Sequence, residues 1–170
     1  MDKELQEKMK SILYFVIKML LFSIPLYIII WTGWESLTYQ NFITHQIKRI
    51  LNLLGIVTMG SGNYFTTNGL QFLISWDCTG WKSILFFIAL IISTPTKFTK
   101  KIIGIIVGLY GLFVTNILRI VILIELAILY GKDFFLFAHD ILWQLFGITI
   151  VLVFWISWIY LEKISFHPTD

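Results

Sequence analysis

Four long apolar stretches constrain this chain more than any other feature of its sequence. A helix that crosses a bilayer needs roughly 20 apolar residues, and runs of about that length make up most of the chain, at residues 12–31, 78–94, 102–130 and 141–161. Only 14% of the side chains are charged, whereas an ordinary soluble domain has about a quarter. We therefore predict an all-α membrane protein with about four transmembrane helices, in a single domain over residues 1–170.

The basic residues predict the orientation of these spans. Cytoplasmic flanks collect lysine and arginine, and an N-inside orientation places most of the basic flanking residues there: Lys3, Lys8, Lys10, Lys97, Lys100, Lys101 and Lys163. The first span ends without a small-residue cleavage site, so we expect an uncleaved anchor. The chain is predicted to lie in the cell membrane with both termini cytoplasmic. Its net charge of +3 comes without a basic stripe, which excludes nucleic acid as a partner.

The segment at 32–77 is the only sizeable external loop in this topology. The apolar run at 49–59 is too short to cross and is predicted to lie at the membrane interface as a helix. Residues 64–74 form two short runs on either side of Asn68-Gly69, and this dipeptide is the strongest short signal for a β-hairpin with a type I′ turn. We expect this hairpin to lead directly into Cys78.

Cys78 is the single cysteine of the chain, and the three histidines are far apart in sequence. An internal disulfide and a multi-thiolate metal site are therefore excluded, and a histidine cluster is not expected. We predict neither a metal nor another cofactor.

Three polar residues are predicted to share one layer near the outer face. Cys78 opens the second span, and Arg119 lies about 27 Å along a helix from Lys101 at the cytoplasmic edge. His139, followed by Asp140, introduces the fourth span. Ionisable residues in a membrane are costly and mark functional sites by default. Asn116 and Arg119 are spaced i and i+3 and predict a polar stripe that faces inward; because the third run is too long for the bilayer, we expect its helix to bend or fray at 115–119.

These residue types together suit cysteine acyl transfer. A helix N-terminus and a basic neighbour favour the thiolate of Cys78, which is the nucleophilic form. The imidazole of His139 is suited to take the thiol proton and donate it to a leaving amine, and the guanidinium of Arg119 to stabilise an oxyanion.

Each residue also has a plainer interpretation. A free cysteine is often inert packing, and Asp77 beside it would disfavour a thiolate or cap the second span. Arg119 and Lys82 are long enough to snorkel, and His139 with Asp140 suits an interfacial residue followed by a helix cap. A non-catalytic assembly subunit and a small transporter remain alternative functions.

The motifs around these residues resemble the exosortase/archaeosortase family. The resemblance rests on Asp-Cys78-Thr-Gly-Trp at the start of one membrane helix, Asn116-Ile-Leu-Arg119-Ile in the next, and His139 before the following one. It covers roughly residues 75–140. Members commonly carry more helices than four, so the chain looks like a minimal core of the family.

The resemblance implies a membrane-embedded cysteine transpeptidase. Its partners would be secreted proteins with a C-terminal motif, hydrophobic helix and basic tail, which are cleaved at the motif and passed to a membrane lipid or another acceptor. Carried over, Cys78 would be the nucleophile, Arg119 the oxyanion stabiliser and His139 the proton shuttle, with Asn116 and Asp140 in support. The face of Gly104, Gly108 and Gly111 suits close packing against the chain's own last span or the substrate.

Overall fold

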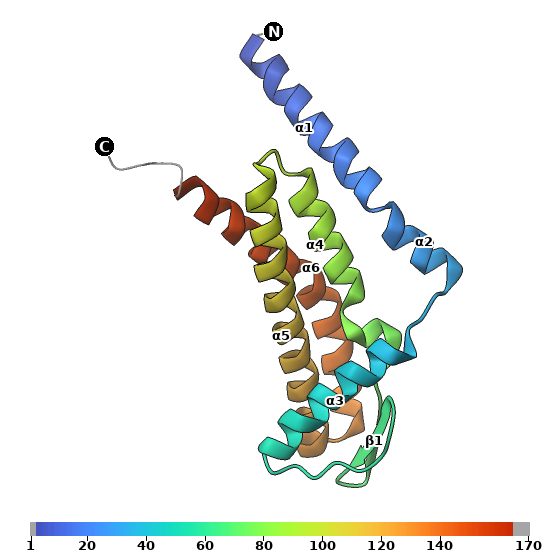
Figure 1. Cartoon of the computed structure of the whole chain (residues 1–170). Helices are drawn as coiled ribbons and strands as arrows, with labels where there is room; N and C mark the ends of the chain where they lie inside the picture. The colour runs from blue at the N-terminus through green and yellow to red at the C-terminus, as the bar shows by residue number, and fades with distance from the viewer. Residues whose placement is uncertain (1–2, 165–170) are drawn as a thin grey trace.

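The first predicted span is built from two helices in a computed structural model, which describes residues 3–164 apart from the side chains of 3–5, 8, 132, 138, 140–146 and 163–164. α1 (Lys3–Phe22) and α2 (Ile24–Thr32) are separated at Ser23. The hydroxyl of Ser23 donates to the carbonyl of Met19 at 2.7 Å, and Pro25 lies in the first turn of α2, where its missing N–H is tolerated. The two helices run in sequence along one side of the molecule (Figure 1).

The segment between the first two predicted spans begins with α3 (Leu37–Leu53). The predicted helix at 49–59 is misplaced, because α3 begins at the Ser36 cap, whose side chain accepts from the N–H of Tyr39. The helix ends before Gly55, which has a left-handed φ of 82°. Ile43, Ile47 and Leu51 recur every four residues and are fully buried, so they form one apolar stripe along the helix.

The predicted hairpin is confirmed. β1 (Tyr64–Thr67) pairs antiparallel with β2 (Leu70–Leu73), and Thr67 opposes Leu70 across the turn. Asn68 and Gly69 both have positive φ, 49° and 77°, as a type I′ turn requires. Phe65 and Phe72 stack with ring centroids 5.6 Å apart and so present one apolar face of the hairpin.

The chain then forms a short 3₁₀ helix, η1 (Trp76–Thr79), and α4 (Trp81–Ser93). Gly80 joins them with a left-handed φ of 80°. The predicted second span at 78–94 therefore differs at its start, because Cys78 lies in η1 and α4 begins three residues later. The left-handed backbone of Gly80 breaks the helical path between the two.

Two long helices complete the fold. α5 (Phe98–Tyr130) and α6 (Lys132–Ile164) each have 33 residues, about 50 Å at the helical rise. α5 is continuous through 115–119, so the predicted fraying is absent, and the alternative of a bend stays a prediction. Its glycines accept rings of neighbouring helices: a Cβ on Gly104, Gly108 or Gly111 would lie 2.1–2.4 Å from Trp158, Phe87 or Phe154. These glycines therefore pack α5 against α4 and α6 of the same chain.

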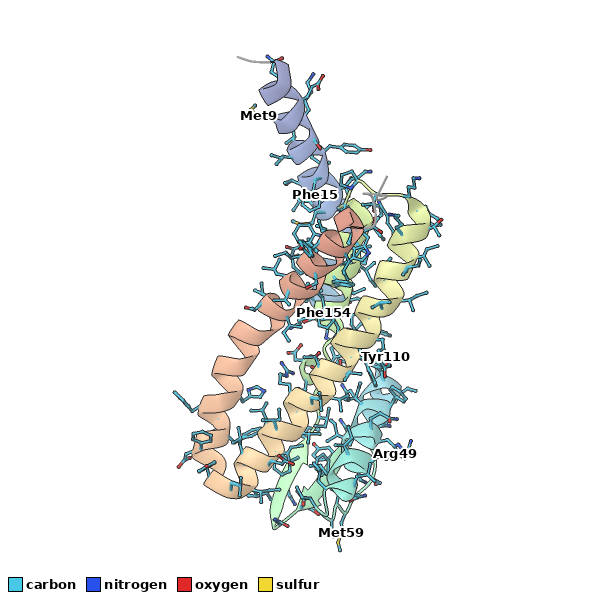
Figure 2. The ribbon with its side chains drawn as sticks, turned by 90° about the vertical axis from the view of Figure 1, so that its left-hand side faces the viewer. Met9, Phe15, Arg49, Met59, Tyr110 and Phe154 are labelled. Atoms are coloured by element: carbon cyan, nitrogen blue, oxygen red, sulfur yellow. The ribbon has the colours of Figure 1, made fainter. Side chains whose placement is uncertain are left out.

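α5 is long enough to contribute residues to two separate hydrophobic cores. Its first half packs with α1, α4 and α6 around Phe87, Ile91, Leu112 and Val151. Its second half lies beneath α3 and the hairpin, where Ile117, Ile120 and Ile124 meet Ile47, Phe65 and Phe72. Figures 1 and 2 show α3 and the hairpin at one end of the molecule, away from the N-terminus. We call this end, with α3, the hairpin and η1, the cap.

Two helices among the described residues are long and apolar enough to cross a membrane, Met9–Thr32 and Phe98–Tyr130. Two shorter apolar helical stretches are Trp81–Ser93 and Gly147–Glu162. Only 6% of the apolar window in Met9–Thr32 is buried inside the fold, so this segment has its apolar side chains available to lipid. The helical architecture fits a membrane protein, and the number of four spans stays a prediction.

Candidate active site

Cys78 lies in η1 at the junction of the cap and the helical bundle. The turn is closed by the N–H of Cys78, which donates to the carbonyl of Ser75 at 3.0 Å. The buried hydroxyl of Thr79 donates to the carbonyl of Trp76 at 2.7 Å. Cys78 is half-buried. The thiol is therefore held on a short, internally bonded turn and keeps part of its surface accessible.

Aromatic side chains fix η1 against the rest of the molecule. The ring of Trp76 stacks on Trp81 with centroids 5.4 Å apart. The edges of Trp34 and Tyr39 meet it at 5.5 and 6.1 Å. Burial raises the pKa of Tyr39, so its phenol stays neutral near pH 7. Residues from three segments thus restrain the turn that carries the thiol.

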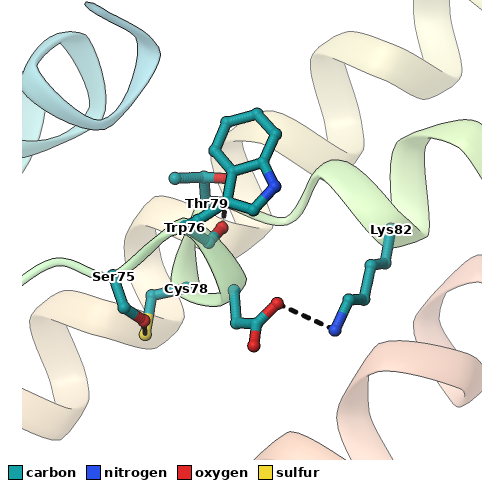
Figure 3. A network of polar contacts seen from close by, with 6 residues as sticks. Ser75, Trp76, Cys78, Thr79 and Lys82 are labelled. Carbon is teal, nitrogen blue, oxygen red and sulfur yellow. Dashed lines mark hydrogen bonds and ion pairs between the residues drawn. The ribbon is translucent and has the colours of Figure 1, made fainter. Parts of the chain in front are cut away.

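Ser75 contacts the thiol directly. Its hydroxyl donates to Sγ of Cys78 at 3.3 Å (Figure 3). Sequence reasoning missed Ser75, although a serine three residues before the cysteine is the spacing that a 3₁₀ turn brings together.

Asn116 on α5 joins the turn to the bundle. Its side-chain amide Nδ2 donates to the carbonyl of Cys78 at 3.0 Å. Gly80 permits this approach, because a Cβ there would lie 3.0 Å from Cγ of Asn116. The Gly in the Cys-Thr-Gly motif therefore has two functions, a left-handed connection and space for the Asn116 amide.

Arg119 follows one turn later on the same face of α5. Its side chain is buried, with 8% of its surface exposed. Together with Gly80 and Asn116 it lines a cavity beside the turn that carries Cys78. The inward polar stripe predicted for Asn116 and Arg119 is present, and both residues face the turn that carries Cys78.

Asp77 and Lys82 form an ion pair beside the thiol. The Lys82 Nζ lies 2.8 Å from Oδ1 of Asp77 (Figure 3), and the side chains keep 41% and 57% of their surface exposed. Lys82 therefore bonds to η1, where the sequence predicted a snorkelling residue. The carboxylate that would disfavour a thiolate at Cys78 has a cation paired with it.

His139 lies on α6 in an aromatic environment. Its ring meets Phe135 at 5.8 Å, and Phe135 in turn meets Phe72 of the hairpin at 6.1 Å. The side chain of Asp140 lies outside the described residues. The structure thus brings Cys78, Asn116 and Arg119 together and places His139 on the neighbouring helix, beside the hairpin.

Two cavities adjoin this arrangement. The larger, of about 510 Å³, is enclosed by residues of α2, η1, α4, α5 and α6, among them Asp77, Lys82, Asn116 and Arg119. The smaller, of about 30 Å³, also touches Asn116 and Arg119. Neither is lined by the hairpin or by His139. The hairpin therefore does not roof either of these two cavities, because its apolar face is engaged with α3 and α5.

Within the part of the chain that the structure describes, no group of three or more His, Cys, Asp or Glu side chains could hold a metal ion. The chemistry that the described site offers is that of a thiol with hydroxyl, amide and guanidinium donors around it. Such a set suits nucleophilic attack on a carbonyl and stabilisation of the oxyanion that results.

Comparison with known protein families finds a match over most of the chain. The model of a family described as transmembrane exosortase matches residues 6–155. This range contains α2, the whole cap and every residue of the site named above. No curated protein and no solved structure matches the chain.

Proposed function

Because the chain belongs to the transmembrane exosortase family, we propose that it is a membrane-embedded cysteine transpeptidase. It cleaves secreted proteins at a C-terminal sorting signal composed of a short motif, a hydrophobic helix and a basic tail. The observation that carries this proposal is the setting of Cys78, whose sulfur accepts from Ser75 and whose backbone carbonyl accepts from Asn116, one turn before the buried Arg119. An inert packing cysteine needs neither neighbour.

In the first step, Sγ of Cys78 attacks the scissile carbonyl carbon. The carbonyl oxygen becomes an oxyanion, and the guanidinium of Arg119 stabilises it. His139 takes the thiol proton and gives it to the leaving amine, so the C–N bond breaks and a thioester forms. The released fragment carries the hydrophobic helix and the basic tail.

In the second step, a nucleophile from the acceptor attacks the thioester. An amine or hydroxyl of a membrane lipid would leave the substrate attached to the envelope, and water would release it. The tetrahedral intermediate again places its negative charge at Arg119. Its collapse breaks the C–S bond, and the proton lost by the nucleophile returns to the sulfur.

Asn116 and Asp140 serve as positioning residues in this scheme. The hydrogen bond from Asn116 to the Cys78 carbonyl fixes the turn relative to Arg119. Asp140, directly after His139 in sequence, would orient the imidazole. Such second partners set the tautomer of a catalytic histidine.

The proposed orientation places the cap and the active site on the external face of the cell membrane. The lysines near the α4–α5 connection and near both chain ends support cytoplasmic termini. Reporter fusions after Lys101 and after Lys163 test this, and both should report a cytoplasmic position. An external signal at either one would contradict the orientation.

The function is tested by co-expressing the enzyme with a secreted protein that carries a tripartite tail from the same genome. The wild-type enzyme should shorten the substrate at its C-terminus, as measured by mass spectrometry. Cys78→Ala should abolish this, because no other thiol is present. Cys78→Ser should be severely impaired, since a hydroxyl ionises far less readily than a thiol. Normal cleavage by Cys78→Ala would refute the proposal and favour a non-catalytic subunit.

A further inference from the structure

The cavity of about 510 Å³ is lined by exposed side chains both beside η1 and on α6. Asp77 and Lys82 line it and are partly exposed beside η1. Ile148 lines it on α6 and keeps 63% of its surface exposed. The cavity therefore joins the cap to the outer surface of the helical bundle, where lipid would surround a membrane protein.

We propose that this cavity is the substrate channel: it receives the peptide segment that precedes the substrate's hydrophobic helix, and the segment arrives sideways from the lipid past Ile148. The inference rests on the transpeptidase function proposed above. It assigns the side opening that a substrate already anchored in the membrane needs in order to reach Cys78.

The polar wall of the cavity matches an extended peptide. Lys82, Asn116 and Arg119 all line it, and each carries N–H donors. Extended backbone offers carbonyl acceptors that must be satisfied away from water. Asn116 also bonds the Cys78 carbonyl, so a peptide on this wall lies next to the turn that carries the nucleophile.

The apolar lining residues lie on the side where the substrate's hydrophobic helix would follow its sorting motif. Phe86 is one turn beyond Lys82 on α4, and Val151 is one turn beyond Gly147 on α6. Both helices run away from the cap (Figure 1). Among the lining residues that the structure describes on α4 and α6, polar side chains thus give way to apolar ones with distance from the cap, in the same order as a sorting motif followed by a hydrophobic helix.

Small side chains keep the channel open between α4 and α6. Gly147 and Ser83 both line the cavity, and a Cβ added at Gly147 would lie 3.8 Å from the Ser83 hydroxyl, an ordinary contact. Gly108 is the opposite case, because Phe87 already fills the space beside it. Gly147 is therefore a position where a methyl group fits and a large ring would fill the channel.

A lipid is the competing occupant. The carboxylate of Asp77 lies on the same wall and engages Lys82, which weakens the attraction of this wall for a phosphate group. The donors of Asn116 and Arg119 suit neutral carbonyls as well as anions. The cavity volume lies within the range of about 300–1,000 Å³ that is common for ligand sites and accommodates a few side chains of a peptide.

The first experiment fills the channel. Gly147→Phe should reduce cleavage of the membrane-anchored substrate at least tenfold, whereas Gly147→Ala should cleave at the wild-type rate. Alkylation of Cys78 by a small water-soluble maleimide should be equal in both variants, which shows that the fold and the thiol are intact. Full cleavage by a folded Gly147→Phe variant would overturn the proposal.

The second experiment separates binding from chemistry. A photoreactive benzoylphenylalanine at position 148 in the Cys78→Ala background should crosslink to the substrate segment just before its hydrophobic helix. The control position is Val153, which has 54% of its surface exposed and does not line the cavity. Adducts with phospholipid alone, or equal crosslinking at both positions, would refute the channel. Substrate crosslinking at 148 together with Cys78-independent cleavage would instead refute the proposed function.

Discussion

The side-chain amide of Asn116 donates a hydrogen bond of 3.0 Å to the backbone carbonyl of Cys78. This bond connects the 3₁₀ turn that carries the thiol to the middle of α5, one turn before Arg119. This amide is therefore a direct link between the turn that carries the nucleophile and the helix that carries the guanidinium. Gly80 leaves the space that this amide occupies, because a Cβ there would lie 3.0 Å from Cγ of Asn116.

Replacement of Asn116 should displace the thiol without removing it. Asn116→Ala leaves the Cys78 carbonyl without this donor, at a cost of about 1–3 kcal/mol. We expect substrate cleavage to fall more than thermal stability in detergent. Asn116→Asp serves as the near-isosteric control, because an ionised carboxylate accepts but does not donate. If Asn116→Asp retained full activity, the amide would not act as a donor.

Gly80→Ala should disturb the site more than the same substitution at Gly33, another left-handed glycine. A non-glycine residue in this backbone region costs roughly 1–2 kcal/mol, and here the Cβ would also meet Asn116. Gly33→Ala is the matched control, because Gly33 has a φ of 64° but nothing within 4 Å of its Cβ position. Cleavage and thermal stability should fall further for Gly80→Ala than for Gly33→Ala. Equal effects would show that Asn116 does not need the space.

The Asp77–Lys82 pair should control the reactivity of the thiol. Lys82→Gln leaves the Asp77 carboxylate uncompensated beside Cys78, so alkylation at neutral pH should slow by about three- to tenfold. Adding Asp77→Asn should restore the rate, since the disfavouring charge is then gone. Iodoacetamide labelling of the single cysteine measures this. A double variant as slow as Lys82→Gln would indicate a packing effect of Lys82 rather than charge compensation.

Arg119→Lys separates charge from geometry. Lysine retains the positive charge but not the planar set of five donors. We expect cleavage to fall by about 100-fold or more, the usual cost of losing an oxyanion donor, with little change in Cys78 alkylation. Activity close to wild type would mean that a positive charge alone is sufficient.

Local signals made part of this fold predictable. Asn68 and Gly69 favour the positive φ angles of a type I′ turn, so the hairpin could be predicted from the sequence. Because the helical rise is constant, counting residues from Lys101 placed Arg119 near the level of Cys78. The i and i+3 spacing likewise predicted that Asn116 and Arg119 share a face.

Contacts between distant segments were not readable in this way. α3 was misplaced because its buried stripe includes the polar residues Gln40 and Thr44, which hide its apolar period. The pairing of Lys82 with Asp77 depends on the left-handed turn at Gly80. The role of Ser75 is apparent only in the structure, where η1 places its hydroxyl next to the sulfur of Cys78.

The central claim is that Cys78 forms a thioester with the substrate, and the most direct measurement is the intact mass of the enzyme purified from cells that express a tripartite-tail substrate. We expect an adduct equal in mass to the substrate without its hydrophobic helix and basic tail. The adduct should map to Cys78 and be released by neutral hydroxylamine, and it should be absent from Cys78→Ala. Continued cleavage of the substrate by Cys78→Ala, or an adduct on another residue of the wild-type enzyme, would contradict the account.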